Sequence, residues 1–511
     1  MRKMSFSKVD LSAGFSVALV ALPLSIGIAL ASGAPASAGL IAAIVGGLVG
    51  SWLGGCQVTI NGPAAGLIVI VLDAILELGH GDNLAGFRGM LAASVVAGFL
   101  QILFGALKLG RKGTAFPVSV IHGMMAAIGL IILAKQTHLL LGHVPHAKNP
   151  IMLFAELPEA VLDIKPLNFL VGVFSLLILV LWPRIDNPVT KRLPAPLVAV
   201  VIGSGLAAFL GFEEKALLSI PADLGSWVIT PDFSVMSTFA GWKASLSLAM
   251  VASLETVLSA AAVDKIDPQR RSSDLDRDLF SKGVCNMLSA SVGGLPMIAE
   301  IVRSSANVTY GARTWLSNFT HGAVILSAVI LFPTTLTRIP LAALAAILVL
   351  VGSRLGSPKH FLHAKKVGLD NLSGFVVTLV MTLAVDLLVG IFAGAVVQFL
   401  VELWLGLKLK DITSAEYETS VANKTTVFSV KSALTFSNFL GIKEKIASLR
   451  RDGTDVKIEL LECEYIDHSV MDQIEELKHD FERNHLHLDV ELSEKHRALG
   501  SDPLSAKKKI S

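Results

Sequence analysis

The stretch Asn61-Gly62-Pro63-Ala64-Ala65-Gly66 interrupts one apolar run, and Gly293-Gly294-Leu295-Pro296 interrupts another. Proline removes a backbone donor and fixes φ, and glycine tolerates unusual backbone angles, so each stretch should break a helix. Two other proline-led runs begin at Phe116-Pro117 and Ile339-Pro340, and their separation along the chain nearly equals that of Pro63 and Pro296. These matching offsets predict two halves of seven spans each.

The composition excludes an ordinary soluble enzyme. Of the 511 residues, 53% are hydrophobic and 16% are charged, and the mean hydropathy is +0.65. Soluble proteins carry about 25% charged residues. Residues 411–511 hold 33 of the 84 charged residues, and the net charge is +7 before residue 411 and −5 after it. The sequence therefore predicts a membrane domain over residues 1–410 and a small soluble domain over 411–511, with a short basic tail.

The apolar runs predict an all-α polytopic membrane domain. A spanning helix needs roughly 20 apolar residues, and the runs give about 14 spans. The long runs are 11–31, 89–107, 117–134, 166–183, 195–211, 241–263, 314–333, 339–353, 371–389 and 391–407. The shorter or Gly/Pro-broken runs are 37–54, 62–78, 279–293 and 296–309.

The basic residues orient these spans. With 14 spans and a cytoplasmic N-terminus, 21 of the 29 Lys and Arg before residue 411 lie in inside segments, among them Lys282, and seven lie in outside segments. The remaining one, Arg303, falls within a span. Because cytoplasmic loops carry an excess of Lys and Arg, this distribution predicts that both termini are cytoplasmic.

Two interrupted spans at matching positions indicate a transport site. A helix that begins at mid-membrane exposes unpaired N–H groups and the positive end of its dipole. Two such ends facing one another can hold an anion without many cationic side chains. Ordinary kinks are the alternative explanation for a single Gly/Pro pair.

Among the ionisable residues inside predicted spans, where a charge is costly and usually functional, the main candidates are Glu255, Glu300 and Arg303. Glu255 shares a helix face with Ser259 and could hold Na⁺ or carry a proton; otherwise it pairs with Arg303 or caps a broken helix. Arg303 could attract anions or pair with Glu300. Glu300 could also be a second proton or cation ligand.

The C-terminal region alternates between strand and helix patterns. Strands are predicted at 427–430, 456–460 and 486–492, and amphipathic helices at 438–449 and 470–483. This order predicts a small α/β domain. The lysines at 507–509 are expected to form a disordered tail near anionic lipid.

The sequence contains no motif that indicates nucleic-acid binding, catalysis or a metal framework. No basic stripe indicates nucleic acid, and no catalytic motif is present, so we expect no enzyme. The three cysteines, Cys56, Cys285 and Cys463, are too far apart for a zinc or disulfide framework. We expect no cofactor and no metal beyond a Na⁺ ion at Glu255.

The sequence resembles the SulP family of inorganic anion transporters, the sulfate permeases, over nearly its whole length. The matching motifs lie in the first, third, eighth and tenth spans. They are Ala21-Leu22-Pro23-Leu24-Ser25-Ile26-Gly27, the Asn61–Gly66 stretch, Ser253-Leu254-Glu255-Thr256 and the segment from Gly293 to Asn307. The C-terminal region resembles the STAS domain that follows such transporters.

The resemblance implies a 7+7 inverted repeat with core and gate domains, an elevator-like movement, and an anion held between the third and tenth helices. The residues that it places around the anion are Gly62, Pro63, Ala64, Ala65, Ile298, Ala299, Glu300 and Arg303. It matches Glu255 and Ser259 to the positions that help bind Na⁺ in Na⁺-coupled members.

Two positions depart from the family pattern. Many members carry small or hydroxyl residues where Ile298 and Glu300 stand. The loop Asp467-His468-Ser469-Val470 stands where soluble regulators have Asp-Ser-Ser-Gly, so only Ser469 keeps a phosphorylatable position. Regulation through Ser469 is therefore a hypothesis.

The sequence thus predicts secondary active transport of bicarbonate or sulfate, coupled to Na⁺ or H⁺. Alternatives are a dicarboxylate/H⁺ symporter, an anion exchanger or channel on the same fold, and a nucleobase carrier. The expected partners are the anion, the bilayer and a second copy of the chain, with contacts through the STAS-like domain and none with nucleic acid. The expected location is a bacterial inner membrane.

Overall fold

The computed structural model describes residues 7–510 apart from 115–116, 144, 146, 148–149, 188–189, 191–192, 222 and 423–424. The described chain forms two compact units. One comprises residues 7–114 and 128–355, and the other comprises residues 117–127 and 356–510. The predicted boundary between residues 410 and 411 falls inside the second unit and remains a prediction.

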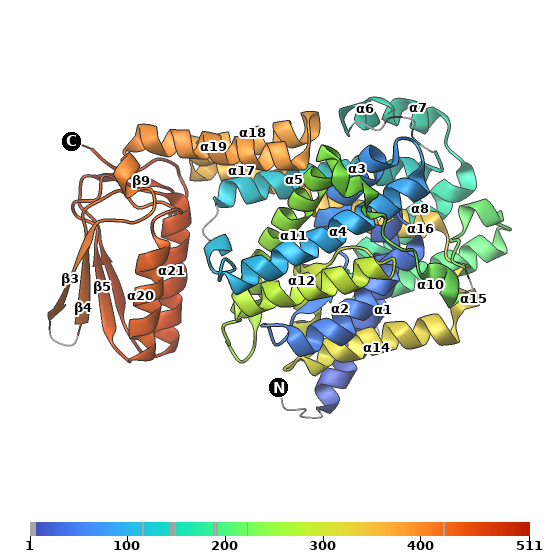
Figure 1. Cartoon of the computed structure of the whole chain (residues 1–511), viewed down its shortest axis with the longest axis horizontal. Coiled ribbons are helices and arrows are strands. Elements are labelled where there is room, and N and C mark those ends of the chain that lie inside the picture. Colours follow the sequence, from blue (N-terminus) through green and yellow to red (C-terminus); the bar gives the residue numbers. More distant parts are fainter. Residues whose placement is uncertain are drawn as a thin grey trace. The chain divides into compact units, whose positions relative to one another are not determined.

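Helices dominate the chain as far as Leu405, and strands cluster near the C-terminus (Figure 1). The helices are α1 (Lys8–Ala31), α2 (Ala36–Leu53), α3 (Ile68–Gly79), α4 (Asn83–Ala106), α5 (Val118–Leu141), α6 (Pro150–Ala155), α7 (Leu157–Leu162), α8 (Pro166–Leu181), α10 (Ala195–Phe209), α11 (Phe239–Ile266), α12 (Leu275–Ser291), α13 (Ile301–Thr309), α14 (Leu316–Leu331), α15 (Pro333–Leu336), α16 (Leu341–Leu355), α17 (Pro358–Val367), α18 (Leu369–Ala384), α19 (Leu387–Leu405), α20 (Leu440–Arg451) and α21 (His468–Arg483). The strands are β1 (Ile60–Gly62), β2 (Ile298–Glu300), β3 (Tyr417–Ala422), β4 (Thr425–Val430), β5 (Asp455–Glu459), β6 (Tyr465–Ile466), β7 (Leu488–Glu491), β8 (His496–Ala498) and β9 (Lys507–Lys509).

Each predicted span contains a helix, although not every helix has the length of a membrane span. In the described part of the chain, eight helices are long and apolar enough to cross a membrane. Three shorter apolar helices are α10, α14 and α18. The two runs that we expected to be broken, 62–78 and 296–309, each begin with extended backbone and continue as the short helices α3 and α13.

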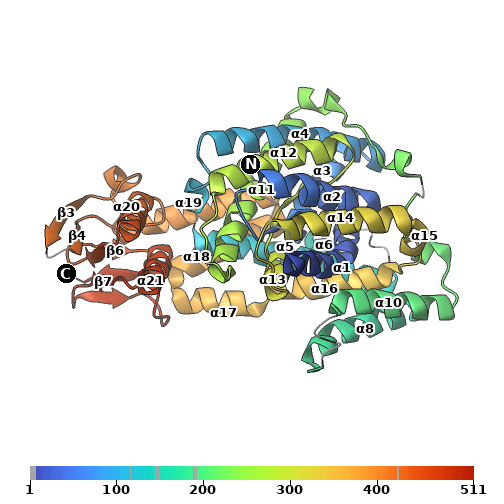
Figure 2. The same cartoon turned by 90° about the horizontal axis from the view of Figure 1, so that it is seen from below.

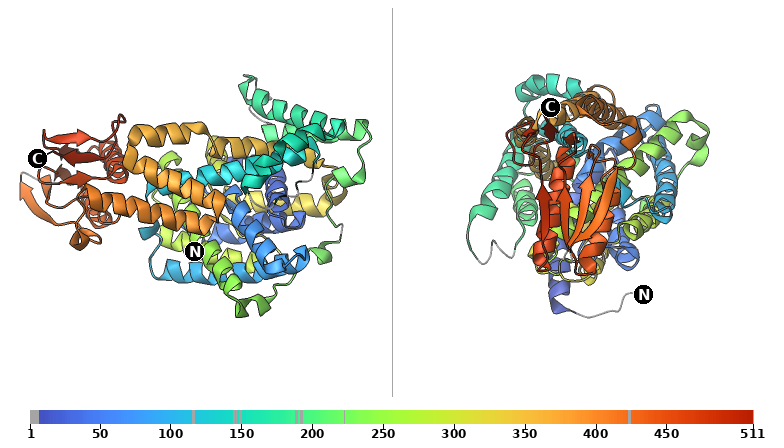
Figure 3. Two further views of the ribbon diagram at one scale, coloured as in Figure 1. Left: turned by 90° about the horizontal axis from the view of Figure 1, so that it is seen from above. Right: turned by 90° about the vertical axis from the view of Figure 1, so that its left-hand side faces the viewer.

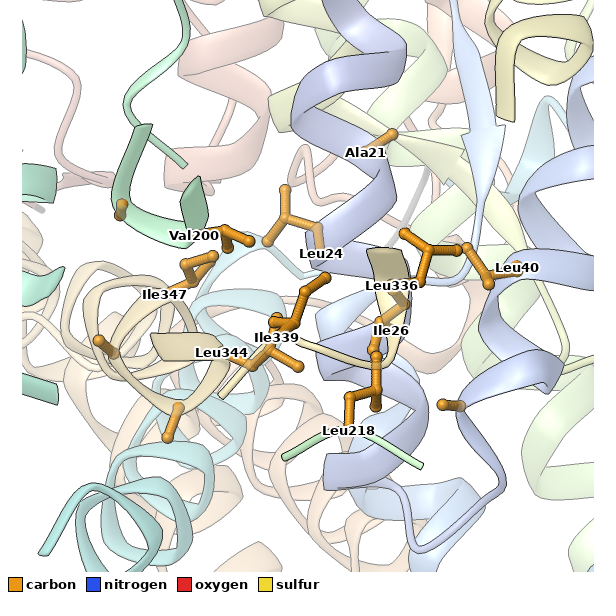
Figure 4. Close-up of a cluster of buried hydrophobic side chains, with 14 of the residues drawn as sticks. Ala21, Leu24, Ile26, Leu40, Val200, Leu218, Leu336, Ile339, Leu344 and Ile347 are labelled. Carbon is orange, nitrogen blue, oxygen red and sulfur yellow. The ribbon is translucent and has the colours of Figure 1, made fainter. Parts of the chain in front are cut away.

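The first unit is held together by aliphatic side chains and close helix contacts. Leu24 and Ile26 of α1, Leu40 of α2, and Leu344 of α16 belong to one buried cluster (Figure 4). Helices α2 and α14 pack together where Gly47 meets Gly322, and they run side by side in Figure 2. A side chain at Gly47 would overlap the Gly322 backbone, so small residues here allow the two helices to approach closely.

A four-stranded sheet in the second unit has the strand order β3-β4-β5-β7. Strands β3 and β4 are antiparallel, whereas β4, β5 and β7 run parallel. Helices α20 and α21 lie along one face of this sheet (Figures 1 and 3). Phe428, Ile458 and Phe481 are buried in its core. The predicted small α/β region is therefore present.

The C-terminal lysines do not form the disordered tail that we expected. Strand β9 is the middle strand of a second sheet, with the order β6-β9-β8, and both of its pairings are antiparallel. The Nζ of Lys509 donates to the carbonyl oxygen of Leu461 at 2.8 Å, and the Nζ of Lys508 lies 5.6 Å from the ring centroid of Trp404. Backbone pairing and these contacts order the segment, because long lysine stems can pack while their charged ends stay accessible.

Candidate functional site

The two interrupted stretches meet in the first unit as a short antiparallel pair of strands. Ile60 lies opposite Glu300, Asn61 opposite Ala299, and Gly62 opposite Ile298. Proline disfavours helical backbone in the residue before it, and Pro63 directly follows β1, which explains why the chain is extended there. The strands satisfy each other's backbone groups, so non-helical backbone can be buried in a membrane domain.

We call this region the paired-strand site: residues 60–66, residues 298–303 and Glu255. It contains the residues assigned to the anion by resemblance. Those that are buried are Gly62, Pro63, Ala64, Ala65, Ile298, Ala299 and Arg303, and Glu300 is partly buried. The structure thus brings the two halves of the predicted anion site into direct contact.

The first half of the site ends in a helix that has no side-chain cap. Ala64 precedes the 3₁₀ turn η1 (Ala65–Leu67), which leads into α3, and Ala64 has φ −116° and ψ 147°. An alanine side chain cannot accept hydrogen bonds from the free N–H groups at a helix start. The carboxylate of Glu255, from α11, lies against Gly66, where an added Cβ would overlap it.

The second half of the site ends in a helix capped by its own carboxylate. Glu300 is the N-cap of α13, and its Oε2 accepts a 2.7 Å hydrogen bond from the backbone N–H of Arg303. The carbonyl oxygen of Glu300 accepts from Ser304 Oγ at 2.5 Å. Glu300 thus contacts the backbone amide of Arg303, so the predicted alternative of a pair between Glu300 and the guanidinium is not the contact formed.

The guanidinium of Arg303 lies inside the paired-strand site, and the residue is 1% exposed. Its Nη2 donates a 2.8 Å hydrogen bond to the carbonyl oxygen of Pro63. Nη1 lies over Gly62, where an added Cβ would be 2.6 Å away. Within the described residues, Nε and Nη1 are buried without a hydrogen-bond partner. Two guanidinium donors are therefore available to a bound anion.

Polar side chains hold the two strands in place. Ser304 Oγ accepts from the Ile60 N–H at 2.9 Å, and Asn318 Oδ1 accepts from the Asn61 N–H at 3.2 Å. The Nδ2 of Asn307 donates to the carbonyl oxygen of Val58 at 2.8 Å. The sequence analysis did not predict that these side chains hold the strands, although their position as polar residues in apolar segments could have indicated it.

A second network fixes the chain just before β2. The Oδ1 of Asn286, in α12, accepts from the Met297 N–H at 2.7 Å, and its Nδ2 donates to the Met297 carbonyl at 3.1 Å. The same Nδ2 donates to Gln101 Oε1 at 2.7 Å. The amide of Gln101 donates at 3.4 Å to Ser253, which lies close to Glu255 in the sequence. This network links α4, α11 and α12 to the site.

The structure also contains a buried ion pair that the sequence analysis did not predict. Lys282 is counted with the inside segments although it also falls in the predicted run 279–293, and the structure places it within α12, where its Nζ is 2.9 Å from Asp278 Oδ1. The two side chains are 0% and 1% exposed. Asp278 Oδ1 also accepts from the Gly55 N–H at 3.1 Å. The pairing explains how a lysine is accommodated in this helix.

The remaining predicted residues lie outside the strand pair. Ser259 is buried one helical turn beyond Glu255 on α11. Ser469, in the second unit, lies in the first turn of α21, is 4% exposed, and donates its N–H to Asp467 Oδ1 at 2.8 Å. Its regulatory role stays a hypothesis.

A cavity of about 230 Å³ lies elsewhere in the first unit. Its lining includes Cys56 and Val58 before β1, Asp264 at the end of α11, and Asp267 with Arg271 beyond it. Asp267 and Arg271 form an ion pair at 2.8 Å. None of the predicted site residues lines this cavity.

The sequence and the fold place this chain in a known class. The model of the sulfate permease family matches residues 8–381. The chain therefore belongs to the sulfate permease family.

Two relatives show how far the similarity extends. A "Putative sulfate transporter YvdB" of Bacillus subtilis is 28% identical over 399 residues, covering 76% of this chain and 72% of that protein. A "Bicarbonate transporter BicA" of Picosynechococcus is 27% identical over 394 residues, covering 76% of this chain and 69% of that protein.

Two solved structures share the fold. The transmembrane domain of a cyanobacterial bicarbonate transporter BicA has a TM-score of 0.67 at 26% identity, covering 76% of this chain and 98% of that chain. The murine Slc26a9 anion transporter in the inward-facing state has a TM-score of 0.69 at 15% identity, covering 96% of this chain and 86% of that chain. The family match and the apolar helices make the chain a multi-pass membrane protein, and its transporter relatives confirm the prediction of a transporter instead of an enzyme.

Proposed function

We propose that this protein is a secondary transporter of a small inorganic oxyanion, bicarbonate or sulfate, coupled to Na⁺ or H⁺. One observation carries the proposal. Two short helices follow the paired strands, and the buried guanidinium of Arg303 reaches from the second helix to the Pro63 carbonyl, with two donors that have no partner within the described chain. The relatives named as sulfate and bicarbonate transporters support this choice of substrates.

The anion would bind at the starts of α3 and α13. Gly62, Pro63, Ala64 and Ala65 would border it on one side. The other side would be formed by Ile298, Ala299, Glu300 and Arg303. Free N–H groups at helix starts and the guanidinium favour a compact anion with several acceptor oxygens, because each donor needs an acceptor.

Glu255 is our candidate for the coupling group, with Ser259 beside it on α11. The Glu255 carboxylate lies against Gly66 at the start of the α3 segment. A cation or proton there would offset a carboxylate that lies close to the bound anion. This closeness gives a physical reason for coupling, because the charge on Glu255 opposes anion binding until it is compensated.

We further propose that the paired-strand site moves as one body in an elevator-like step, within a 7+7 inverted repeat of core and gate domains. The pairing of β1 with β2 supports this, since it ties together two stretches that are far apart in the sequence. For the C-terminal α/β region we propose a STAS-like domain that contributes to a homodimer. We propose a bacterial inner membrane as the location, with both termini in the cytoplasm.

Uptake into proteoliposomes tests the proposal. Labelled bicarbonate, sulfate and fumarate would be offered separately, with a Na⁺ gradient or a pH gradient imposed alone. We expect one inorganic anion to accumulate against its own gradient when one cation gradient is present. Uptake that only equilibrates would indicate a channel, and uptake that requires an internal anion would indicate an exchanger. Accumulation of fumarate alone would indicate a dicarboxylate symporter.

A further inference from the structure

Glu300 is an unusual residue for the start of a helix. Short side chains such as Ser, Thr, Asp and Asn are preferred at the N-cap, because they reach the free N–H groups without curling back. Glu300 nevertheless places Oε2 2.7 Å from the backbone nitrogen of Arg303. A carboxylate, which is an anion with two acceptor oxygens, therefore already lies at the helix end where we propose that substrate binds.

A second observation concerns the guanidinium donors of Arg303. Arg303 is 1% exposed, and among the residues that the structure describes its Nε and Nη1 have no hydrogen-bond partner. The Glu300 oxygen contacts the backbone N–H of Arg303 instead. A buried cation without a partnered anion is costly, so these donors favour binding of an external anion.

We propose that Glu300 is a tethered competitor of the substrate anion. Its carboxylate binds the start of α13 when the site is empty and leaves it when the substrate binds there and to Arg303. This inference rests on the proposed function, because it takes the paired-strand site to be the anion site. In this role Glu300 sets the affinity of the site for the substrate. The role also explains why a carboxylate is present in an anion site.

A series of substitutions separates the charge of Glu300 from its capping role. Glu300→Ser keeps a good N-cap without charge, Glu300→Gln keeps the length without charge, and Glu300→Asp keeps both charge and cap. Asp386→Asn is the matched control, since Asp386 caps α19 in the same way, with Oδ1 2.8 Å from the Val389 nitrogen. Thermal stabilisation of the purified full chain by bicarbonate or sulfate reports binding without requiring transport.

We expect the half-maximal anion concentration to fall about tenfold in Glu300→Ser and Glu300→Gln, because a charged hydrogen bond no longer has to be displaced. Glu300→Asp and Asp386→Asn should bind as the wild type does. An unchanged or higher concentration in both neutral variants would overturn the proposal.

Comparing binding with uptake distinguishes this proposal from the proposed function. Anion binding that tightens in the neutral variants supports the role of Glu300 even if the wild type accumulates no anion, a result that would count only against coupled transport. Wild-type accumulation with unchanged binding in both neutral variants overturns the role of Glu300 alone. Absence of binding in the wild type and in both neutral variants contradicts both proposals.

Discussion

The Nη2 of Arg303 donates a 2.8 Å hydrogen bond to the carbonyl oxygen of Pro63, so a cation from one interrupted stretch binds the backbone of the other. The planar guanidinium can make this contact and still direct its other donors elsewhere. A lysine has the same charge but lacks this fixed fork of donors.

Arg303→Lys should therefore weaken anion affinity even though the charge is kept. We expect the KM for uptake to rise about tenfold, since a charge-assisted hydrogen bond is lost. Initial rates across a range of anion concentrations in proteoliposomes measure this change. The control is Arg88→Lys, because the Arg88 side chain donates to Thr230 at an exposed position. An unchanged KM in Arg303→Lys would mean that Arg303 is only a structural residue.

Gly62 and Gly66 lie where side chains would displace the charged groups of the site. An added Cβ at Gly62 would be 2.6 Å from Arg303 Nη1, and one at Gly66 would overlap the Glu255 carboxylate. Gly62→Ala should raise the KM for the anion, and Gly66→Ala should reduce cation dependence. Gly205→Ala is the control, since a Cβ at Gly205 has nothing within 4 Å. Equal activity of all three variants would rule out close approach as a requirement.

Glu255→Gln should abolish cation-driven accumulation while the protein remains folded. The amide keeps the shape of the side chain against Gly66 but removes the charge that we propose for coupling. Uptake with and without a Na⁺ or pH gradient measures the effect, and size-exclusion chromatography checks folding. Ser259→Ala should reduce coupling less, because it removes a neutral oxygen. Full gradient-dependent accumulation by Glu255→Gln would exclude the proposed role.

Asp278→Asn should destabilise the first unit, because it leaves Lys282 charged and unpaired. Breaking a buried ion pair by removing one partner costs about 3–5 kcal/mol. Thermal unfolding of the purified chain should therefore occur at a markedly lower temperature, and Asp278→Asn combined with Lys282→Met should recover part of the loss. The comparison is Glu77→Gln, whose carboxylate meets Lys243 at 3.3 Å with side-chain exposures of 43% and 33%. Such an exposed pair contributes only about 0–1 kcal/mol.

Asp467 should make the C-terminal α/β region sensitive to pH. Burial raises the pKa of Asp467 to about 6, although the N–H groups of Ser469 and Phe436 donate to its carboxylate. A carboxyl whose pKa is raised on folding contributes stability below its unfolded pKa and loses it as pH rises through the folded pKa. The advantage of the wild type over Asp467→Asn should thus fall as the pH rises from about 4 to about 6.

Hydrogen exchange of the full chain measures this difference in peptides that cover residues 465–483. Protection in the wild type relative to Asp467→Asn should decrease over that pH interval, after correction for intrinsic exchange rates. Peptides from α4 should show no such trend. A difference that grows with pH would mean that the folded state favours the charged carboxylate.

Local patterns in the sequence predicted most of the helices and the interrupted stretches. Proline and glycine at 62–63 and 293–296 act on their own neighbours, so their effect can be recognised without a structure. The pairing of Asn61 with Ala299 is not local, and nothing in either stretch alone specifies the partner. The position of Lys282 could not be predicted from its charge, because the compensating contact with Asp278 depends on burial within α12.

The candidate site was predictable as a set of residues but not as a set of contacts. The apolar runs identified Glu300 and Arg303 as charges inside a span and left open whether their side chains pair, and the resemblance placed both around the anion. The structure resolves that choice, because the Glu300 side chain curls back to the Arg303 amide while the guanidinium points to Pro63. Side-chain direction at a helix start depends on the three-dimensional path of the chain, which composition and spacing do not encode.

The C-terminal lysines have a practical consequence for work on this protein. Because β9 lies between β6 and β8, deleting residues 507–510 would leave two strands without their shared neighbour. A truncation that removes this basic segment would thus expose two unpaired strand edges, and exposed edges promote aggregation. Affinity tags are better placed at the N-terminus, and faster proteolysis after C-terminal trimming would reveal the damage.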